Sequence, residues 1–547
     1  MSTDPTAVGP HDPVSVERHE TIGHWLRGRA EQLGDRPLLD VVGKHRSAVD
    51  TYQGARDIAA GLVGLGLAPG DRVAVMMVNS ASCIDAWLGI CIAGMIEVPI
   101  NTSQRGDLLA YLLTQSGTRA IIVDVALADR VERIAADVAS LEHVVVCNDD
   151  SPREETLGLD LPSRLALHPF ESIRSDAPTP DPGIDCYATS TVLYTSGTTG
   201  PSKGVVLSHC ANIYLARHTA RLMEYTEDDV LFSAFPLFHI NAKYTSTFVA
   251  IEVGSRLVLR DRFSASGFWD LCREEGITAF NYQGALLLML YKQPERADDR
   301  AHQVTKAFGA PCPVDLWEPF EERFGVMLNE VYGMTEIAIA SENPKDDRRI
   351  GSAGRASAQF EMRIVDENDE PVPPRTAGEI VVRPRVPGVM IDRYFDMPEA
   401  TIEAFRNLWF HTGDRGYLDE DDFLWFVDRL KDCIRRRGEN ISSFEVEKTL
   451  INHPAVLESA AYGVQSDLSE EDVMVALVLQ PDAVLDPIEL LDWCQKRLAH
   501  FAVPRYVRVV EELPKTPSQR IQKFKLRDEG ITNDTWDRES VGYEVRR

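Results

Sequence analysis

Short apolar runs alternate with amphipathic stretches along the first third of the chain. Residues 72–78 form a continuous apolar run that predicts a buried strand, and Asn79-Ser80 then supplies the cap of a helix expected over residues 81–93. The same alternation continues downstream, with strands expected at 97–100, 120–125 and 144–147 and a helix near 107–115. Strands that alternate with helices predict parallel sheets with crossover helices, so we expect an α/β fold.

Two later regions have different patterns. Residues 149–182 are polar and contain several prolines, which indicates a surface connection without regular structure. Near the C-terminus, apolar runs at 460–464 and 473–479 predict short strands, and residues 487–499 predict a helix. This pattern is typical of a smaller α+β unit that follows the large α/β region.

The composition is that of a folded protein with more than one domain. The chain has 547 residues, of which 44% are hydrophobic and 26% are charged, and a single core does not grow to that size. The 85 acidic and 57 basic side chains give a net charge of −28, which repels nucleic acids and anionic membranes. We expect neither as a partner, although backbone N–H groups and a few basic side chains can still bind a small anion.

Cysteines and targeting segments point to no other class of protein. The nine cysteines are scattered without a CxxC pair or a zinc-ligand spacing, which is typical of buried thiols in a reducing compartment. Residues 1–27 lack the apolar core of a secretory signal, and no apolar run reaches the roughly 18 residues that a membrane span needs. We therefore expect a soluble, cytoplasmic protein.

The strongest chemical signal is a segment rich in glycine and hydroxyl residues, Tyr194-Thr-Ser-Gly-Thr-Thr-Gly-Pro-Ser-Lys-Gly204, which follows a strand expected at 191–194. We expect a loop that leads into a helix beginning near Ser208. Glycines let the backbone approach a phosphate, hydroxyls donate hydrogen bonds to its oxygens, and a lysine adds a positive charge, although the spacing is not that of a Walker loop. The residues expected to bind phosphate are Thr195, Ser196, Gly197, Thr198, Thr199, Gly200 and Lys203.

This loop resembles the signature of the adenylate-forming superfamily, which includes acyl- and aryl-CoA synthetases, luciferases and the adenylation domains of peptide synthetases. The similarity covers residues 21–527. Further segments resemble the motifs of that superfamily in the same order, namely Pro236-Leu-Phe-His239, Gly309-Ala-Pro311, Tyr332-Gly-Met-Thr-Glu336, His411-Thr-Gly-Asp414, Asp428-Arg-Leu-Lys-Asp432 and Gly438-Glu-Asn-Ile441.

The resemblance implies a domain organisation as well as a chemistry. It implies a large N-terminal AMP-binding domain of layered sheets and helices at residues 1–430, joined by a hinge to a mobile α+β domain at 431–530 and followed by a tail at 531–547. It also implies that the protein uses ATP, Mg²⁺ and coenzyme A.

The nucleotide contacts are implied residue by residue. Tyr332 would stack on adenine, Thr335 would lie near the α-phosphate, and Glu336 would hold Mg²⁺, a hard cation that prefers oxygen ligands. Asp414 would accept hydrogen bonds from both ribose hydroxyls, and Arg429 would contact the ribose too. The segment expected to contact adenine consists of Gly309, Ala310 and Pro311.

Two residues have more than one interpretation. The resemblance makes His239 an aromatic gate between the acyl pocket and the thiol channel, whereas a histidine in an apolar segment is otherwise most often a buried core residue. Lys431 corresponds to the hinge residue of the family, whose backbone torsions change as the C-terminal domain rotates. Its other interpretation is a charged surface turn.

The chain departs from the family pattern near its C-terminus. The family has Gly-Lys where this chain has Gln519-Arg520, and that lysine bridges the substrate carboxylate and the α-phosphate during adenylation. Arg520 keeps the charge on a longer, planar side chain. Either Arg520 takes this role, or Lys523 or Lys525 replaces it, or adenylation is slow or unusual.

A second departure is Arg435-Arg-Arg437 before Gly438, where many relatives carry Gly-Gly beside the pantetheine tunnel. The arginines either bind the phosphates of coenzyme A or form a solvated basic turn. Arg435 and Gly438 are therefore candidate residues for binding coenzyme A.

The sequence predicts an ATP-dependent ligase that converts a small carboxylate to an acyl-adenylate and pyrophosphate, then forms a thioester with coenzyme A and releases AMP. Among subfamilies, residues 236–241 and the run Arg-Arg-Arg-Gly-Glu-Asn-Ile-Ser look most like carnitine/crotonobetaine-CoA ligases. One alternative is an enzyme that uses ATP with nitrite and an aromatic amine. A second alternative is an enzyme that adenylates a carboxylate for a carrier protein. A third is a non-catalytic nucleotide sensor, but the intact Lys203, Thr335, Glu336 and Asp414 argue against that one.

The expected lining of the substrate pocket includes one basic side chain. Lys243 either pairs with a second acidic group on the substrate or faces solvent. The full set of expected lining residues is Phe238, Asn241, Lys243, Tyr282, Gln283, Gly284 and Ala285. Neither the acyl group nor the oligomeric state follows from these residues.

Overall fold

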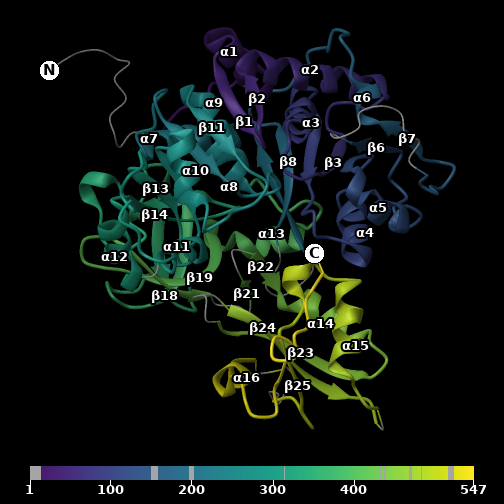
Figure 1. Cartoon of the computed structure of the whole chain (residues 1–547), viewed down its shortest axis with the longest axis vertical. Coiled ribbons are helices and arrows are strands. Elements are labelled where there is room, and N and C mark those ends of the chain that lie inside the picture. The colour runs from purple at the N-terminus through teal and green to yellow at the C-terminus, as the bar shows by residue number, and fades with distance from the viewer. Residues whose placement is uncertain are drawn as a thin grey trace.

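A seven-stranded sheet forms the first half of the N-terminal region (Figure 1). The structure is a computed structural model that describes residues 14–148, 158–195, 202–312, 314–429, 433–436, 439–466, 471–481, 483–514, 521 and 523–546. In sheet order the strands are β7 (Ala166–Pro169), β6 (His143–Cys147), β5 (Ala120–Asp124), β3 (Arg72–Met76), β4 (Ile96–Pro99), β8 (Thr189–Thr195) and β9 (Lys203–Ser208). All neighbours are parallel except β8 and β9.

A nine-stranded sheet forms the second half. In sheet order its strands are β16 (Arg355–Ala356), β15 (Ala338–Glu342), β14 (Met327–Met334), β13 (Lys306–Gly309), β12 (Ala279–Tyr282), β10 (Val230–Ser233), β11 (Arg256–Leu259), β1 (Pro37–Val41) and β2 (Lys44–Ser47). The run from β14 to β1 is parallel, and the antiparallel strands β15, β16 and β2 lie at its edges. Because parallel strands end at the same edge, the residues after β10, β12, β13 and β14 are brought together.

Helices cover both faces of each sheet. Between the two sheets lie α1 (Ile22–Leu33), α2 (Ala48–Gly64), α3 (Ala81–Ile92), α7 (His209–Leu222) and α9 (Phe248–Val253), all of which contribute to one shared core. The outer face of the seven-stranded sheet packs on α4 (Gly106–Gln115) and α5 (Ala128–Ile134), and that of the nine-stranded sheet packs on α10 (Phe268–Glu275), α11 (Gly284–Tyr291) and α12 (Val314–Phe324). This confirms the predicted layers of sheets and helices.

Local sequence explains why α3 is the central helix. It is largely apolar and buried along its length from Ala81 to Cys91, as expected for a helix between two sheets, and its one charged residue, Asp85, is paired with Arg46 and Arg174. The Ser80 hydroxyl accepts a hydrogen bond from the Cys83 amide at 3.1 Å, so the predicted cap is present.

A third sheet and a small domain complete the chain. The antiparallel third sheet contains β17 (Phe360–Val365), β18 (Gly378–Pro384), β19 (Phe410–Leu418) and β20 (Leu424–Arg429), and α13 (Pro398–Ala404) precedes β19. The C-terminal region has the pair β21 (Cys433–Arg436) and β22 (Glu439–Ser442) and a sheet of β23 (Val456–Gln465), β24 (Glu471–Leu479), β25 (Tyr506–Val509) and β26 (Trp536–Asp537). Its helices are α14 (Ser443–Ile451), α15 (Pro487–Gln495) and α16 (Lys523–Glu529).

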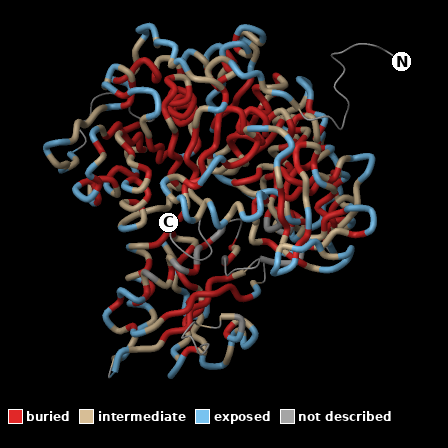
Figure 2. The backbone as a smooth tube through the Cα atoms, turned by 180° about the vertical axis from the view of Figure 1, so that it is seen from behind, coloured by how far each residue is buried: buried red, intermediate tan, exposed pale blue. Residues whose placement is uncertain are grey.

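The C-terminal region has a core of its own. Figure 2 shows buried strands in the lower part of the molecule that are separate from those of the large region. One face of the β23–β26 sheet packs on α14 and α15, and the other packs on Leu526 of α16. None of the helices in the described ranges is long and apolar enough to cross a membrane.

Three sequence expectations were wrong in detail. Residues 149–182 are not wholly irregular, because β7 and α6 (Phe170–Ile173) lie within them. The helix predicted over 487–499 ends earlier, since α15 stops at Gln495. The glycine-rich segment does not lead directly into a helix, because Lys203 begins strand β9, which pairs with β8 before α7 starts at His209.

Candidate active site

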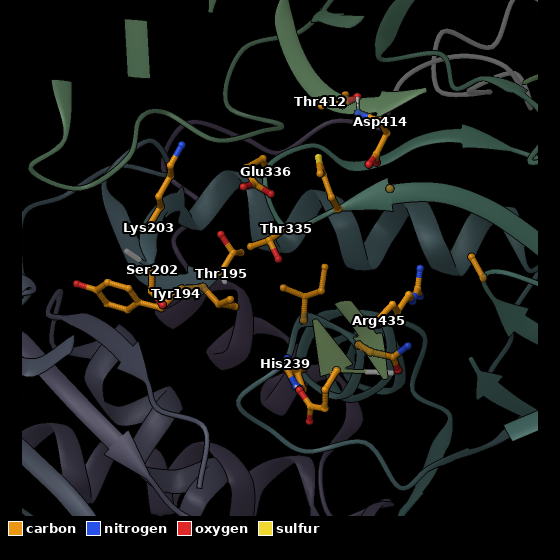
Figure 3. Close-up of a pocket in the computed structure, with 18 of the residues that line it drawn as sticks. Tyr194, Thr195, Ser202, Lys203, His239, Thr335, Glu336, Thr412, Asp414 and Arg435 are labelled. Carbon is orange, nitrogen blue, oxygen red and sulfur yellow. Dashed lines mark hydrogen bonds and ion pairs between the residues drawn. The ribbon is translucent and has the colours of Figure 1, made fainter. Parts of the chain in front are cut away.

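One large cavity lies where the two sheets meet the C-terminal domain (Figure 3). It has a volume of about 860 Å³. Its walls come from β8 and β9, from the carboxyl ends of β10, β12, β13 and β14, from the start of β19, and from β22 and α14 of the C-terminal domain. Most motifs singled out in the sequence therefore converge on a single site, as expected for the edge at which parallel strands end.

The corner of the cavity that is expected to hold adenosine, called the adenosine corner below, is built around Tyr332 and Asp414. The Tyr332 hydroxyl donates a hydrogen bond to Asp414 Oδ2 at 2.9 Å, and both residues are buried. The Asp414 amide donates to Thr412 Oγ1 at 3.1 Å, and the Thr412 hydroxyl donates to the Ile380 carbonyl at 2.7 Å. Arg429 lies opposite Asp414 in the ladder between β19 and β20. A carboxylate held in this way is suited to accept hydrogen bonds from a vicinal diol.

The expected adenine segment follows β13. At Gly309 a Cβ atom would lie 2.1 Å from the Tyr282 carbonyl oxygen, so only glycine lets these two strands end side by side. Ala310 and Pro311 line the cavity directly after it. Glu330 closes this corner by accepting a hydrogen bond from the Cys312 amide at 2.8 Å, and burial raises the pKa of its carboxyl group to about 8.

The corner that is expected to hold the phosphates, called the phosphate corner below, is organised by Tyr394, a residue that the sequence did not single out. Its hydroxyl donates to Glu336 Oε1 at 3.0 Å, and the Lys203 ammonium lies 4.8 Å from the centre of its ring. Burial and the Glu336 carboxylate raise the pKa of Tyr394, so it remains a neutral donor. Thr195 and Thr335 line the same part of the cavity (Figure 3). Lys203 and Glu336, which lie far apart in sequence, are thus held by one phenol.

The side chains present fit a magnesium ion carried in with a nucleotide. Glu336 is a buried carboxylate that lines the cavity beside Lys203. Mg²⁺ usually takes one or two carboxylates and completes its coordination with phosphate oxygens and waters. One carboxylate at the phosphate end of the cavity meets that requirement.

His239 lies at the boundary between the two domains and is not a core residue. Its side chain is 40% exposed, and its Nε2 atom lies 3.4 Å from a carboxylate oxygen of Glu439 on β22. Its ring also contacts Phe238, with 4.7 Å between the ring centres. A residue of the C-terminal domain therefore touches the expected gate.

The three consecutive arginines do not act as one cluster. Arg435 lines the cavity, whereas Arg436 is buried and donates to Asp472 Oδ1 at 2.8 Å and to the Phe501 carbonyl at 2.8 Å. The expectation that all three bind coenzyme A phosphates was therefore wrong for Arg436. Arg437 lies outside the described residues.

Several expected site residues also lie outside the described residues, namely Ser196, Gly197, Thr198, Thr199, Gly200, Lys431, Gly438 and Arg520. The described segment after position 520 does not line the cavity. Lys523 there contacts Ser443 Oγ and Glu447 Oε1, each at 2.7 Å, and α16 lies on the side of the C-terminal domain away from the large region (Figure 1).

The expectation for Lys243 was wrong. Its side chain is only 1% exposed, forms an ion pair with the equally buried Glu97, and lies 4.3 Å from the centre of the Trp87 ring. Lys243 belongs to the core between the sheets and not to the cavity. Phe238, Asn241, Tyr282 and Gln283 do line the cavity, as expected.

Comparisons with known proteins agree with this geometry. The family model described as AMP-binding enzyme matches residues 26–391, and the model of the C-terminal domain of AMP-binding enzymes matches residues 445–520. The chain belongs to this family, the adenylate-forming enzymes, and it is an ATP-dependent, AMP-forming ligase.

Individual relatives include a crotonobetaine/carnitine–CoA ligase from Salmonella arizonae. It is 32% identical over 469 residues, which cover 85% of this chain and 89% of the relative. The solved o-succinylbenzoate CoA synthetase from Bacillus subtilis superposes with a TM-score of 0.79 at 25% identity over 92% of this chain and 98% of that one. A benzoate CoA ligase from Burkholderia xenovorans shares the fold, with a TM-score of 0.67 at 24% identity over 93% of this chain and 100% of that one.

Proposed function

We propose that the protein activates a small carboxylic acid with ATP and then transfers the acyl group to the thiol of coenzyme A. The observation that carries this proposal is the shape of the site. One cavity joins an adenosine corner at Asp414, a phosphate corner at Lys203 and an uncharged wall at Asn241. Relatives named as CoA ligases support coenzyme A as the acceptor.

In the first step a substrate oxygen attacks the α-phosphorus and pyrophosphate leaves. Lys203 and the Thr195 and Thr335 hydroxyls are suited to stabilise the charge on the phosphate oxygens, because they enter the transition state already oriented. Tyr332 and Asp414 hold the nucleoside, which fixes the α-phosphorus relative to the acid. A magnesium ion on Glu336 supplies additional charge neutralisation for the leaving group when it is bound.

In the second step the thiol attacks the acyl carbon and AMP leaves. His239 and Glu439 mark the point at which the C-terminal domain meets the cavity wall, and Arg435 adds a positive charge to the same side. We propose that the thiol-bearing end of coenzyme A enters the cavity along this boundary between the two domains. Lys431 is proposed as the hinge and Arg520 as the cation that serves adenylation.

The decisive experiment measures pyrophosphate release from ATP and Mg²⁺ with a panel of aliphatic, carnitine-like and aromatic carboxylates, with and without coenzyme A. A carboxylate-dependent release followed by a CoA-dependent mass shift of the acid is the expected result. Release that requires nitrite and an aromatic amine, or a thioester only on a phosphopantetheine carrier, would replace coenzyme A transfer with one of those activities. Tight ATP binding without any release would contradict catalysis.

A further inference from the structure

The wall of the cavity next to His239 is a short helical segment with two different faces. It consists of α8 (Ile240–Ala242) followed by a π-helical turn, Lys243–Thr247. Asn241 and Thr245 stand one turn apart and both line the cavity, whereas Lys243, halfway between them, points into the core toward Glu97. The charged residue of this segment is thus turned away from the cavity and a neutral amide is turned toward it.

A buried asparagine on the neighbouring strand fixes the orientation of that amide. Asn281 of β12 donates through Nδ2 to the Thr245 carbonyl at 3.2 Å, to Ser246 Oγ at 2.9 Å and to Asn241 Oδ1 at 3.0 Å. A backbone carbonyl can only accept, so the Asn281 atom that faces it must be the NH₂ group. The atom of Asn241 that meets this NH₂ group must then be the oxygen.

The consequence is that the NH₂ group of Asn241 is not used within the protein. Among the described residues, neither this group nor the side-chain amide of Gln283 has a hydrogen-bond partner, and both residues line the cavity. Both side chains are half-buried and open to the cavity, so a ligand that supplies a partner replaces water there and gains the net value of a hydrogen bond. Asn241 offers a fixed donor, and Gln283 offers a donor and an acceptor.

The rest of this wall is apolar or neutral. Its lining residues from 240–245 and 282–283 include no charged side chain, and Phe235, Phe238 and Ile339 provide apolar surface. The carboxyl group of Glu330, near the adenine segment, is occupied by the Cys312 amide. An ammonium or a second carboxylate placed against residues 240–245 and 282–283 would lose water without a partner of opposite charge on this wall, because the charged lining residues Arg435 and Glu439 belong to the C-terminal domain.

We infer, on the basis of the proposed ligase function, that the acid activated here has an apolar or aromatic body that carries an uncharged hydrogen-bond acceptor. Asn241 Nδ2 recognises this acceptor, which is a hydroxyl, ether or keto oxygen. The site discriminates against substrates with an ammonium group or a second carboxylate. This differs from the named substrates of the carnitine–CoA ligase relatives, which makes Asn241 a specificity-determining residue of this chain.

The test compares kcat/KM for pyrophosphate release among matched acids. The panel contains benzoate with its 2-, 3- and 4-methoxy derivatives, hexanoate with its 4- and 5-oxo derivatives, 4-trimethylammoniobutanoate, and adipate. The best acceptor-bearing acid is expected to exceed its unsubstituted parent by about tenfold, since the net value of one hydrogen bond corresponds to about that factor. An unsubstituted, ammonium or dicarboxylic acid that equals or exceeds it would overturn the inference while the ligase function stands.

Two variants of Asn241 locate the effect. Asn241→Leu is expected to remove the advantage of the acceptor-bearing acid over its unsubstituted parent, which is about tenfold. Asn241→Asp keeps the shape and the hydrogen bond from Asn281 but presents an acceptor to the cavity. It should reverse the preference toward 4-trimethylammoniobutanoate, and an unchanged order of substrates in this isosteric variant would contradict the assignment even if the leucine variant fails to fold.

A matched control places the same new charge elsewhere in the cavity. Asn101 lines the side near the C-terminal domain, so Asn101→Asp is expected to leave the ratios between the acids unchanged. If Asn101→Asp changes the ratios of kcat/KM between the acids as much as Asn241→Asp does, the effect comes from the added charge in general, and the inference is overturned. If no carboxylate supports release in the unchanged protein, the proposed ligase function fails and the inference fails with it.

Discussion

The two sides of the cavity are held in different ways. On the N-terminal side, the functional groups are fixed by hydrogen bonds between buried residues, Tyr332 to Asp414 at 2.9 Å and Tyr394 to Glu336 at 3.0 Å. On the C-terminal side, the described contacts across the domain boundary include the partly exposed pairs His239 to Glu439 at 3.4 Å and Ser103 to His500 at 3.0 Å, together with a hydrogen bond from Ser202 to Glu445.

This difference distinguishes the N-terminal side, which stays the same throughout the reaction, from the C-terminal side, which can be replaced between steps. Hydrogen bonds in buried surroundings keep the nucleotide groups in place whether or not substrate is bound. Partly exposed ion pairs contribute on the order of 1 kcal/mol or less, so the C-terminal wall can leave at little cost. The nucleotide side is preorganised, and the acceptor side is suited to be replaced between two half-reactions.

The sharpest test of this comparison is Arg520→Ala. If Arg520 serves adenylation in a second arrangement of the C-terminal domain, this variant should lose substrate-dependent pyrophosphate release by at least about 100-fold. Thioester formation from a supplied acyl-adenylate should remain within about twofold. Stopped-flow or quenched assays of the two half-reactions measure this directly.

Arg520→Lys, which restores the residue found in the family, is the control for that variant and should recover most of the release. Equal loss of both half-reactions in Arg520→Ala would show that the residue does not act in adenylation alone.

Tyr394→Phe tests the preorganised side. The ring that lies under Lys203 is kept, but Glu336 loses the hydroxyl that orients it, so kcat for pyrophosphate release should fall about tenfold. The requirement for Mg²⁺ should rise, because the carboxylate is less well positioned. A Mg²⁺ titration of the initial rate measures both effects, and an unchanged Mg²⁺ dependence would remove Tyr394 from this role.

Glu439→Gln tests the exchangeable side. Loss of the charge beside His239 should slow the thioester step by about threefold and leave adenylation unchanged, as expected for one partly exposed ion pair. The exposed Glu511→Gln in the same domain is the matched control and should change neither step. A slower first step in Glu439→Gln would mean that this contact also supports adenylation.

Glu330→Gln addresses the stability of the fold and not the rate of either half-reaction. The native carboxyl group keeps its proton up to a pKa of about 8, whereas the unfolded one ionises near pH 4.5, so the native state binds more protons between these values. Unfolding free energy should then fall as pH rises through this range, by at most about 1.4 kcal/mol per pH unit.

The Glu330→Gln variant lacks the titrating carboxyl group, so its free energy of unfolding should not fall with pH for this reason. Urea denaturation at pH 5 and pH 8 should give a stability difference between the variant and the unchanged protein that grows with pH. A difference that is the same at both pH values would contradict the buried, protonated state of Glu330.

Much of this site could be predicted from sequence because its residues belong to short local motifs. Tyr332, Glu336 and Asp414 were found through short motifs that resemble those of the adenylate-forming superfamily, and the periodic apolar runs predicted β3, α3 and β5 closely. Helices and strands of this kind follow from local pattern and capping.

The missed features depend on contacts between distant segments. Tyr394 lies 58 positions from Glu336, and no spacing rule connects them. Lys243 was expected at the cavity because its polarity was considered without Glu97, which comes 146 positions earlier and compensates its burial. Strand β9 was missed because its apolar run of three residues, Val205–Leu207, is too short to be separated by pattern alone from the start of the following helix, whereas its pairing with β8 defines it.

The position of the edge strand β26 affects the order in which the two domains can fold during translation. Trp536 and Asp537 pair with β25, and Tyr543 donates to Asp492 of α15 at 2.7 Å. The sheets of the large region contain no residue beyond Arg429, so they can close while the rest of the chain is still being translated. Only the edge strand of the small domain's sheet waits for residues 536–537, and nascent chains can pass through a stage in which the sheets of the large region are complete while that edge is still open.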